Sequence, residues 1–221
     1  MSHNREAQQW VLLGTSAASN QVWGLSEIDF PCGYMMPPGA YAQEGQPLER
    51  PGSDSVWAMG GFAFELSCGG NAIASSDAEI CIAGYRPWVC VFHNALLDEL
   101  VHREHTIKMW DQGVSIFHGL WRQSTQYLGE LIPLDRMNAI EGSATYIDID
   151  GNKEEGEAFR SYVHKAPEVI KFMSKFMTLS AGDIWVLGPL VASKLPEKSS
   201  SFIFGTENLR VNARVTEWPG Y

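Results

Sequence analysis

Two histidines at helical spacing are the first residues in the sequence that suggest chemistry. His102 and His105 lie three residues apart in the segment 94–105, where leucines recur at helical spacing, so both imidazoles can face one ligand. A zinc site would also need a carboxylate in an arrangement such as HExxH, and that motif is missing around them. A zinc site is therefore disfavoured.

The acidic segment around residue 150 begins like a calcium loop but fits a hairpin better. After Asp148-x-Asp150-x-Asn152, Lys153 stands where a calcium loop needs glycine, and Phe159 stands where it needs a bidentate glutamate. Residues 144–149 alternate between apolar and polar side chains, and Asp150-Gly151 is typical of a type I′ turn. The segment therefore predicts two strands joined by a tight turn.

Several other functional classes are excluded by missing motifs and by charge. The sequence has no GxSxG, GxxxxGK[ST] or GxGxxG motif. Its formal net charge is −10 with scattered Lys and Arg, which argues against nucleic acid or an anionic membrane as a partner. No apolar run reaches the roughly 18 residues of a membrane span, and the N-terminus lacks a signal-peptide pattern. We therefore expect a cytoplasmic protein.

The four cysteines show no pattern that indicates a disulfide framework or a metal site. Cys32, Cys68, Cys81 and Cys90 have no CxxC spacing and lie in apolar or glycine-rich stretches. For a cytoplasmic chain of 221 residues, we predict four reduced thiols that behave as small buried hydrophobic residues.

Length and hydrophobic patterning predict the elements that must position any site. A chain of 221 residues with 45% hydrophobic content fits a single domain, 1–221, with 1–55 as an N-terminal extension and loop region packed on it. The overall pattern is strand-dominated and of the α+β class. Apolar runs predict strands at 10–14, 56–67, 88–92 and 184–187, with closing strands in 202–218.

Helices are predicted at only a few places. Residues 15–20 are small and polar, which indicates a loop or cap, and Ser75-Ser76-Asp77 indicates a short capped helix. Pro167 is predicted to begin a helix. Its apolar face should contain Val169, Ile170, Met173, Phe176 and Met177.

Several ordered segments point to one protein family. They are YMMPPG (34–39) with QPL (46–48), IKMWD (107–111), the hairpin YIDIDGNKEEG (146–156), and PEVIKFMSKFMTLSAGD (167–183). They resemble, in the same order, the elements FxKPPSALxGxGxPI, AKSxD, strand–NGE–strand and helix–FMTLxPGD–strand of the fumarylacetoacetate hydrolase-like superfamily. The resemblance runs from about Tyr34 to Gly188, and its last motif is the most specific.

The resemblance implies a mixed β-sandwich roll, usually dimeric, that acts on small 2-oxo or polyoxo acids. The family performs C–C hydrolysis, decarboxylation, hydration and tautomerisation. In these reactions a divalent cation, typically Mg²⁺, chelates adjacent keto and carboxylate oxygens of the substrate and stabilises the enolate as a Lewis acid.

The carboxylates that would hold this cation are largely missing. The family uses a Glu-x-Glu pair on a strand and a later aspartate. The strand 62–66 keeps only the second glutamate, Glu65, with Ala63 at the first position. The later GYTxxND element corresponds either to Gly84-Tyr85 or to 91–95; in both registers the aspartate is absent, and the second puts Ala95 there. We therefore predict no bound metal, with Mg²⁺ as the alternative.

Other family motifs depart as well. Met36 replaces the lysine of the KP element, and residues 16–23 replace the NYxxHxxE segment without its His/Glu pair. The usual TGTPxG becomes Leu187-Gly188-Pro189-Leu190-Val191-Ala192, which is closer to hydratase-like relatives.

The resemblance nevertheless selects candidate site residues. The candidate catalytic residues are Lys108, Glu65, His105 and Asp111, and the candidate substrate-binding residues are Met36, His102, Gly188 and Pro189. Lys108 would hold a carboxylate or enolate oxygen in place of the cation, and His105 or Glu65 would act as general base or acid. The alternative is that Lys108 and Asp111 form an ion pair at a loop hinge.

Three functions stay open. The first is a divergent enzyme for a small oxo acid or polyketide-type oxygenated compound, of isomerase, cyclase, decarboxylase or hydratase type, without a tightly bound metal. The second is a non-catalytic subunit that pairs with an intact homologue. The third is a Mg²⁺-dependent hydrolase, hydratase or decarboxylase. The expected assembly is a homodimer, or a heteromer in the second case.

Overall fold

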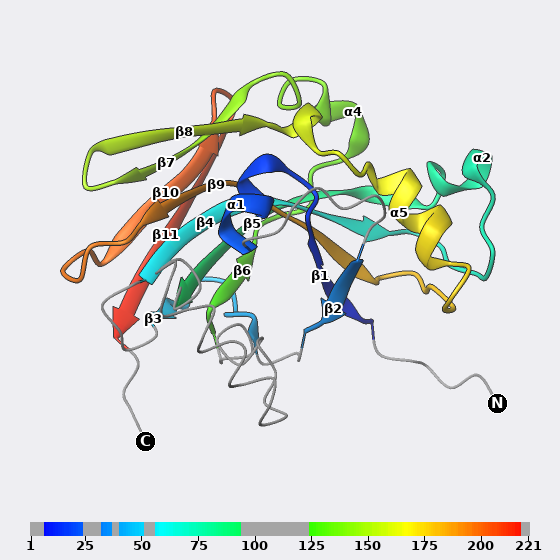
Figure 1. The fold of residues 1–221 in the computed structure, drawn as a ribbon, viewed down its shortest axis with the longest axis horizontal. Coiled ribbons are helices and arrows are strands. Elements are labelled where there is room, and N and C mark those ends of the chain that lie inside the picture. Colours follow the sequence, from blue (N-terminus) through cyan, green and yellow to red (C-terminus); the bar gives the residue numbers. More distant parts are fainter. Residues whose placement is uncertain (1–6, 24–31, 37–39, 51–55, 94–123, 218–221) are drawn as a thin grey trace.

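The computed structural model describes residues 7–23, 32–36, 40–50, 56–93 and 124–217 (Figure 1). These residues form two mixed β-sheets with a few short helices packed around them. In the described ranges, no helix combines the length and apolar composition that crossing a bilayer requires.

The larger sheet has six strands in the order β2-β1-β9-β4-β5-β6. β1 runs parallel to β9 and antiparallel to β2, while β4 pairs antiparallel with β5 and β9, and β5 with β6. The predicted apolar strands at 10–14, 56–67, 88–92 and 184–187 are confirmed, and the last two continue further than predicted. The strands are β1 (Gln9–Leu13), β2 (Cys32–Met35), β4 (Val56–Leu66), β5 (Ile82–His93), β6 (Gln126–Leu128) and β9 (Ile184–Lys194).

The smaller sheet has five strands in the order β3-β11-β10-β7-β8. Its strands are β3 (Leu48–Arg50), β7 (Ala144–Ile149), β8 (Asn152–Ala158), β10 (Ser201–Thr206) and β11 (Leu209–Glu217). Asp150 and Gly151 both have positive φ, 53° and 85°, as a type I′ turn requires. The predicted hairpin is therefore confirmed, and so are the closing strands.

The main core lies between the two sheets. Aromatic rings from both sheets and from the helical connection after β8 meet there edge to face: Phe62 contacts Phe204 and Phe159, and Phe159 contacts Tyr162 and Tyr85. Phe62 and Phe204 are fully buried. Edge-to-face ring contacts of this kind are favourable beyond the apolar area they bury.

The helices are short, and some differ from the prediction. Of the loop or cap predicted for residues 15–20, the cap is confirmed: Ser16 accepts a hydrogen bond from the Ser19 backbone N–H at 2.9 Å, and α1 (Ala17–Trp23) begins directly after it. The helix predicted at Pro167 is confirmed as α5 (Ala166–Met173), but Phe176 lies beyond its end and is 72% exposed. The remaining helices are α2 (Ser75–Ala78), η3 (Phe159–Ser161) and α4 (Leu134–Met137).

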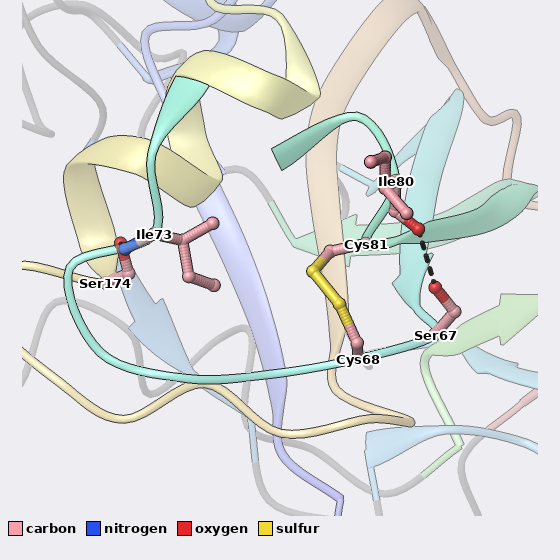
Figure 2. The surroundings of a disulfide bond; sticks show 6 residues. All are labelled: Ser67, Cys68, Ile73, Ile80, Cys81 and Ser174. Atoms are coloured by element: carbon pink, nitrogen blue, oxygen red, sulfur yellow. Dashed lines mark hydrogen bonds between the residues drawn. A yellow bond between two sulfur atoms is a disulfide. The ribbon is translucent and has the colours of Figure 1, made fainter. Parts of the chain in front are cut away.

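The prediction of four reduced thiols is wrong for two cysteines. Cys68 and Cys81 form a disulfide that closes the loop between β4 and β5, with their Cα atoms 4.9 Å apart (Figure 2). The loop packs on the end of α5, where the Ile73 backbone N–H donates to Ser174 Oγ at 2.9 Å. Sequence spacing did not indicate the pair because strand pairing brings the two ends of the loop together. Cys90 is free and buried, as predicted.

Candidate functional site

Strand β4 separates the aromatic core from a second apolar layer on the opposite face of the larger sheet. Its even-numbered residues, such as Phe62 and Phe64, face the aromatic core, while Met59 and Ala63 face the other way. We call this second layer the site face. It is built from Val11, Met36, Ala40, Met59, Ala63, Trp88, Cys90, Phe92 and Val186, all of which are buried.

Cys90 lies at the middle of the site face. On β5 it is paired with Met59 of β4 on one side and with Gln126 of β6 on the other. The Trp88 indole N–H donates to Gln126 Oε1 at 2.7 Å, and Gln126 Nε2 contacts Met36 Sδ at 3.7 Å. The buried amide of Gln126 is therefore held between an indole and a thioether.

Two ionisable groups near this point are kept neutral by burial. Burial raises the pKa of the Cys90 thiol far above its ordinary value. Burial, and the nearby Cys90, raise the pKa of the Tyr41 phenol in the same way. Among the described residues, the Tyr41 hydroxyl has no hydrogen-bond partner. At physiological pH the site face thus contains a neutral thiol, and the neutral phenol of Tyr41 packs against it.

β9 contains a bulge where it pairs with Gly61 and Ala63 of β4. Gly61 pairs with Pro189 and Ala63 with Val186, so β9 has an extra residue over this interval. Three successive carbonyl oxygens of the bulge each accept a hydroxyl from another element. Thr15 donates to Leu187 O, Tyr162 to Gly188 O at 2.7 Å, and Ser16 to Pro189 O at 2.5 Å.

The bulge leaves no space for a side chain at its closest approach to β4. Gly188 has φ +88°, and a Cβ at Gly61 would lie 2.1 Å from the Gly188 carbonyl oxygen and 2.8 Å from the Tyr162 hydroxyl. That hydroxyl also accepts a hydrogen bond from the Phe62 N–H at 3.0 Å. Burial raises the pKa of Tyr162, so it stays a donor. Both glycines are therefore required by the packing.

Glu65 lies on the same face of β4 but towards its other end. Its Oε2 accepts a hydrogen bond from Arg86 Nε at 2.7 Å, and the two side chains form an ion pair. Arg86 Nη1 also donates to the Gly129 carbonyl at 2.9 Å. Both side chains are partly exposed, which screens the pair. The role of Glu65 as acid or base stays a prediction. Its carboxylate is already paired with the Arg86 guanidinium.

The structure places part of the predicted site together. Met36 packs in the site face with Met59 and Cys90, and Gly188 and Pro189 lie against Gly61. The other predicted residues, His102, His105, Lys108 and Asp111, lie outside the described residues.

Sequence reasoning missed several residues that shape this region. They are Thr15, Ser16, Gln126 and Tyr162, and each is fully or almost fully buried. Single hydroxyls and an amide carry no motif, so their only signal was a polar residue within an apolar surrounding.

Sequence comparison now decides the family. The family model for the fumarylacetoacetate (FAA) hydrolase C-terminal region matches residues 2–211. The chain belongs to the fumarylacetoacetate hydrolase family. No curated protein sequence matches it.

Solved structures of family members share the fold. A protein of the fumarylacetoacetate hydrolase family from Yersinia pestis is 18% identical, with a TM-score of 0.76 and coverage of 96% of this chain and 95% of its own. Fumarylpyruvate hydrolase from Pseudomonas aeruginosa, solved with Mn²⁺ and pyruvate, is 17% identical, with a TM-score of 0.74 and coverage of 98% and 94%. A 5-carboxymethyl-2-hydroxymuconate delta-isomerase from Mycobacterium smegmatis is 15% identical, with a TM-score of 0.70 and coverage of 97% and 80%.

The described residues of this family member do not offer the donor set that a hard divalent cation needs. Within the described ranges, no three His, Cys, Asp or Glu side chains are grouped so that they could hold an ion. Mg²⁺ and Mn²⁺ prefer carboxylate, carbonyl and water oxygens, whereas the site face presents thioether, thiol and hydrocarbon groups.

Proposed function

We propose that this family member is an enzyme that transforms a small oxo acid or polyketide-type oxygenated compound without a tightly bound metal. The reaction would be of the isomerase, cyclase, decarboxylase or hydratase type. Membership of the family supports an enzymatic role, since the structural neighbours include proteins named as a hydrolase and an isomerase.

The observation that carries the proposal is the site face itself. Met36 lies beside Met59 and Cys90, and the Gly188-Pro189 bulge adjoins the same stretch of β4. Of these, Met36, Gly188 and Pro189 are residues that the family resemblance assigns to substrate binding. An apolar wall with a few fixed polar groups is the usual lining of a small-molecule site.

The catalytic groups in this proposal come mainly from the segment outside the described residues. Lys108 would hold a developing enolate or carboxylate oxygen, because a fixed ammonium can stabilise negative charge where a metal would otherwise do so. His105 would transfer the proton, with Asp111 as a further catalytic residue and His102 against the substrate. Glu65 is the alternative acid or base.

The test is turnover of a panel of 2-oxo and polyoxo acids and their polyketide-type analogues by the full-length protein, followed by mass spectrometry. We expect Lys108→Ala to reduce turnover by about 100-fold or more, because removal of one preorganised oxyanion donor has effects of that size. Lys171→Ala, at an exposed position on α5, is the matched control and should leave turnover unchanged.

Two outcomes would count against the proposal. Turnover that survives Lys108→Ala would remove the role of that lysine. Turnover that disappears with chelator and returns with Mg²⁺ would instead support the conventional metal-dependent hydrolase, hydratase or decarboxylase.

A non-catalytic subunit is the second candidate, and the absence of the family's Glu-x-Glu pair on the strand 62–66 favours it too. In that case the chain would pair with an intact homologue and stabilise it, whereas the first proposal expects a homodimer. Co-expression with a family member that keeps its carboxylates, followed by size-exclusion chromatography, separates the two. An active homodimer of this chain alone would exclude the subunit role.

A further inference from the structure

The position of the missing aspartate can be located on the sheet. When Gly84-Tyr85 is matched to the first two letters of GYTxxND, the aspartate falls on Cys90. In β5 this residue points into the site face and is fully buried. Its partner on β4 is Met59, and residues paired across an antiparallel sheet have Cβ atoms about 5 Å apart.

This position fixes where a Glu-x-Glu pair would have to lie. The same-face neighbours of Met59 on β4 are Trp57 and Gly61, so a pair that shares an ion with residue 90 would occupy 57 and 59 or 59 and 61. None of these positions has a carboxylate. Glu65 lies six residues beyond Met59, or about 20 Å along the strand, which is too far to share an ion with Cys90.

The packing also prevents a carboxylate from being accommodated at position 61. The Gly188 carbonyl would lie 2.1 Å from a Cβ there. The carbonyl cannot simply withdraw, because Tyr162 holds it at 2.7 Å and the neighbouring carbonyls of 187 and 189 are held by Thr15 and Ser16. Backbone, not a flexible side chain, therefore fills the space.

We infer that the stretch of β4 and β5 around Met59 and Cys90 is the former cation position of the family, now closed by an apolar, sulfur-rich layer that binds no divalent ion. The inference deepens the proposed function by stating that the oxygens of the substrate are met by protein donors and not by a chelated ion. It depends on the proposed function only for that last step, since the metal affinity can be measured without any substrate.

The first experiment is a Mn²⁺ titration of the full-length wild-type protein by isothermal calorimetry, alone and with pyruvate. We expect no saturable binding up to about 1 mM and no change in Tm with Mn²⁺ or chelator. Stoichiometric binding of Mn²⁺ would overturn the inference. If that binding were lost in Glu65→Gln, the cation position would lie at Glu65. Failure to find a substrate would affect only the proposed function.

The second experiment restores oxygen ligands at the inferred position. In the double variant Met59→Glu/Cys90→Asp, we expect Mn²⁺ to bind at least about tenfold more tightly than in the wild type and to raise Tm, because a ligand that binds only the folded state stabilises it. The matched control, Met59→Gln/Cys90→Asn, has the same shape without the charges and should gain neither. A folded double variant, checked by circular dichroism, that binds no better than this control would overturn the assignment of residues 59 and 90.

Gly61→Glu supplies a third arm. Because its Cβ would meet the Gly188 carbonyl, we expect this variant to lose stability and to gain no Mn²⁺ affinity. A stable Gly61→Glu protein with increased Mn²⁺ affinity would show that β9 can yield, and would contradict the closure of the site.

Discussion

The two faces of β4 share one backbone but pack against different kinds of neighbour. One face contributes Phe62 and Phe64 to an aromatic core shared with the smaller sheet. The other contributes Met59 and Ala63 to the site face. Both are fully buried, but the first packs against aromatic rings of the smaller sheet, whereas the second packs in a layer that also contains methionine and cysteine side chains.

The difference shows why a fold can persist while its chemistry changes. The aromatic core joins the two sheets, because its rings come from β4 and β5 of one sheet and from β10 of the other. The site face has to satisfy packing alone once no ion is held there, and flexible residues such as methionine fill irregular space readily. Function-bearing positions can therefore be replaced by apolar ones without disturbing the architecture.

The largest effect on stability is expected when a side chain that faces the aromatic core is truncated. Phe62→Ala should lower the free energy of unfolding by about 3–5 kcal/mol, because it removes a fully buried ring and leaves a cavity. Met59→Leu, the nearly isosteric change on the opposite face, should cost less than about 1.5 kcal/mol. Urea unfolding measures both, and equal losses would contradict the distinction between the two faces.

A smaller effect is expected at Tyr162, whose hydroxyl connects β4 with the bulge of β9. Tyr162→Phe leaves the Phe62 N–H without its acceptor and the Gly188 carbonyl without its donor, so it should cost about 1–3 kcal/mol. Hydrogen exchange of the Phe62 amide should accelerate in the variant. Tyr146→Phe is a control at a half-buried tyrosine on β7. An unchanged stability in Tyr162→Phe would show that the bulge is held by Thr15 and Ser16 alone.

The smallest effect is an absence of reaction at Cys90. Because burial raises the pKa of this thiol, it should carry little thiolate and should resist alkylation by iodoacetamide in the native protein at pH 8. After reduction, Cys68, which is partly exposed, should be labelled, and peptide mapping distinguishes the two. Rapid labelling of Cys90 would mean that the site face opens to solvent.

Much of the fold could be predicted because strand periodicity and turn chemistry are local. The alternation over 144–149 and the Asp150-Gly151 turn determine the β7–β8 hairpin, and the apolar runs mark β1 and β4. The family resemblance was confirmed by the match over residues 2–211. The Cys68–Cys81 disulfide was not predictable, since spacing alone does not show that two strand ends meet.

The candidate site was less accessible to sequence reasoning because it depends on cross-strand register. A single-sequence comparison placed Ala63 and Glu65 at the Glu-x-Glu positions, whereas strand pairing puts Met59 opposite Cys90. The side chains that hold the β9 bulge come from residues 15, 16 and 162, which lie far from it in sequence. Only the folded chain shows that they act together.

The contact between Gly61 and the Gly188 carbonyl has an evolutionary consequence. A descendant of this protein that regained an acidic residue at position 61 would first need substitutions that release β9 from its three hydroxyl donors. Each of those changes alone leaves a buried carbonyl without its hydroxyl donor and lowers stability. A carboxylate pair at 59 and 61 would therefore require several coupled substitutions, whereas a pair at 57 and 59 would not meet this contact.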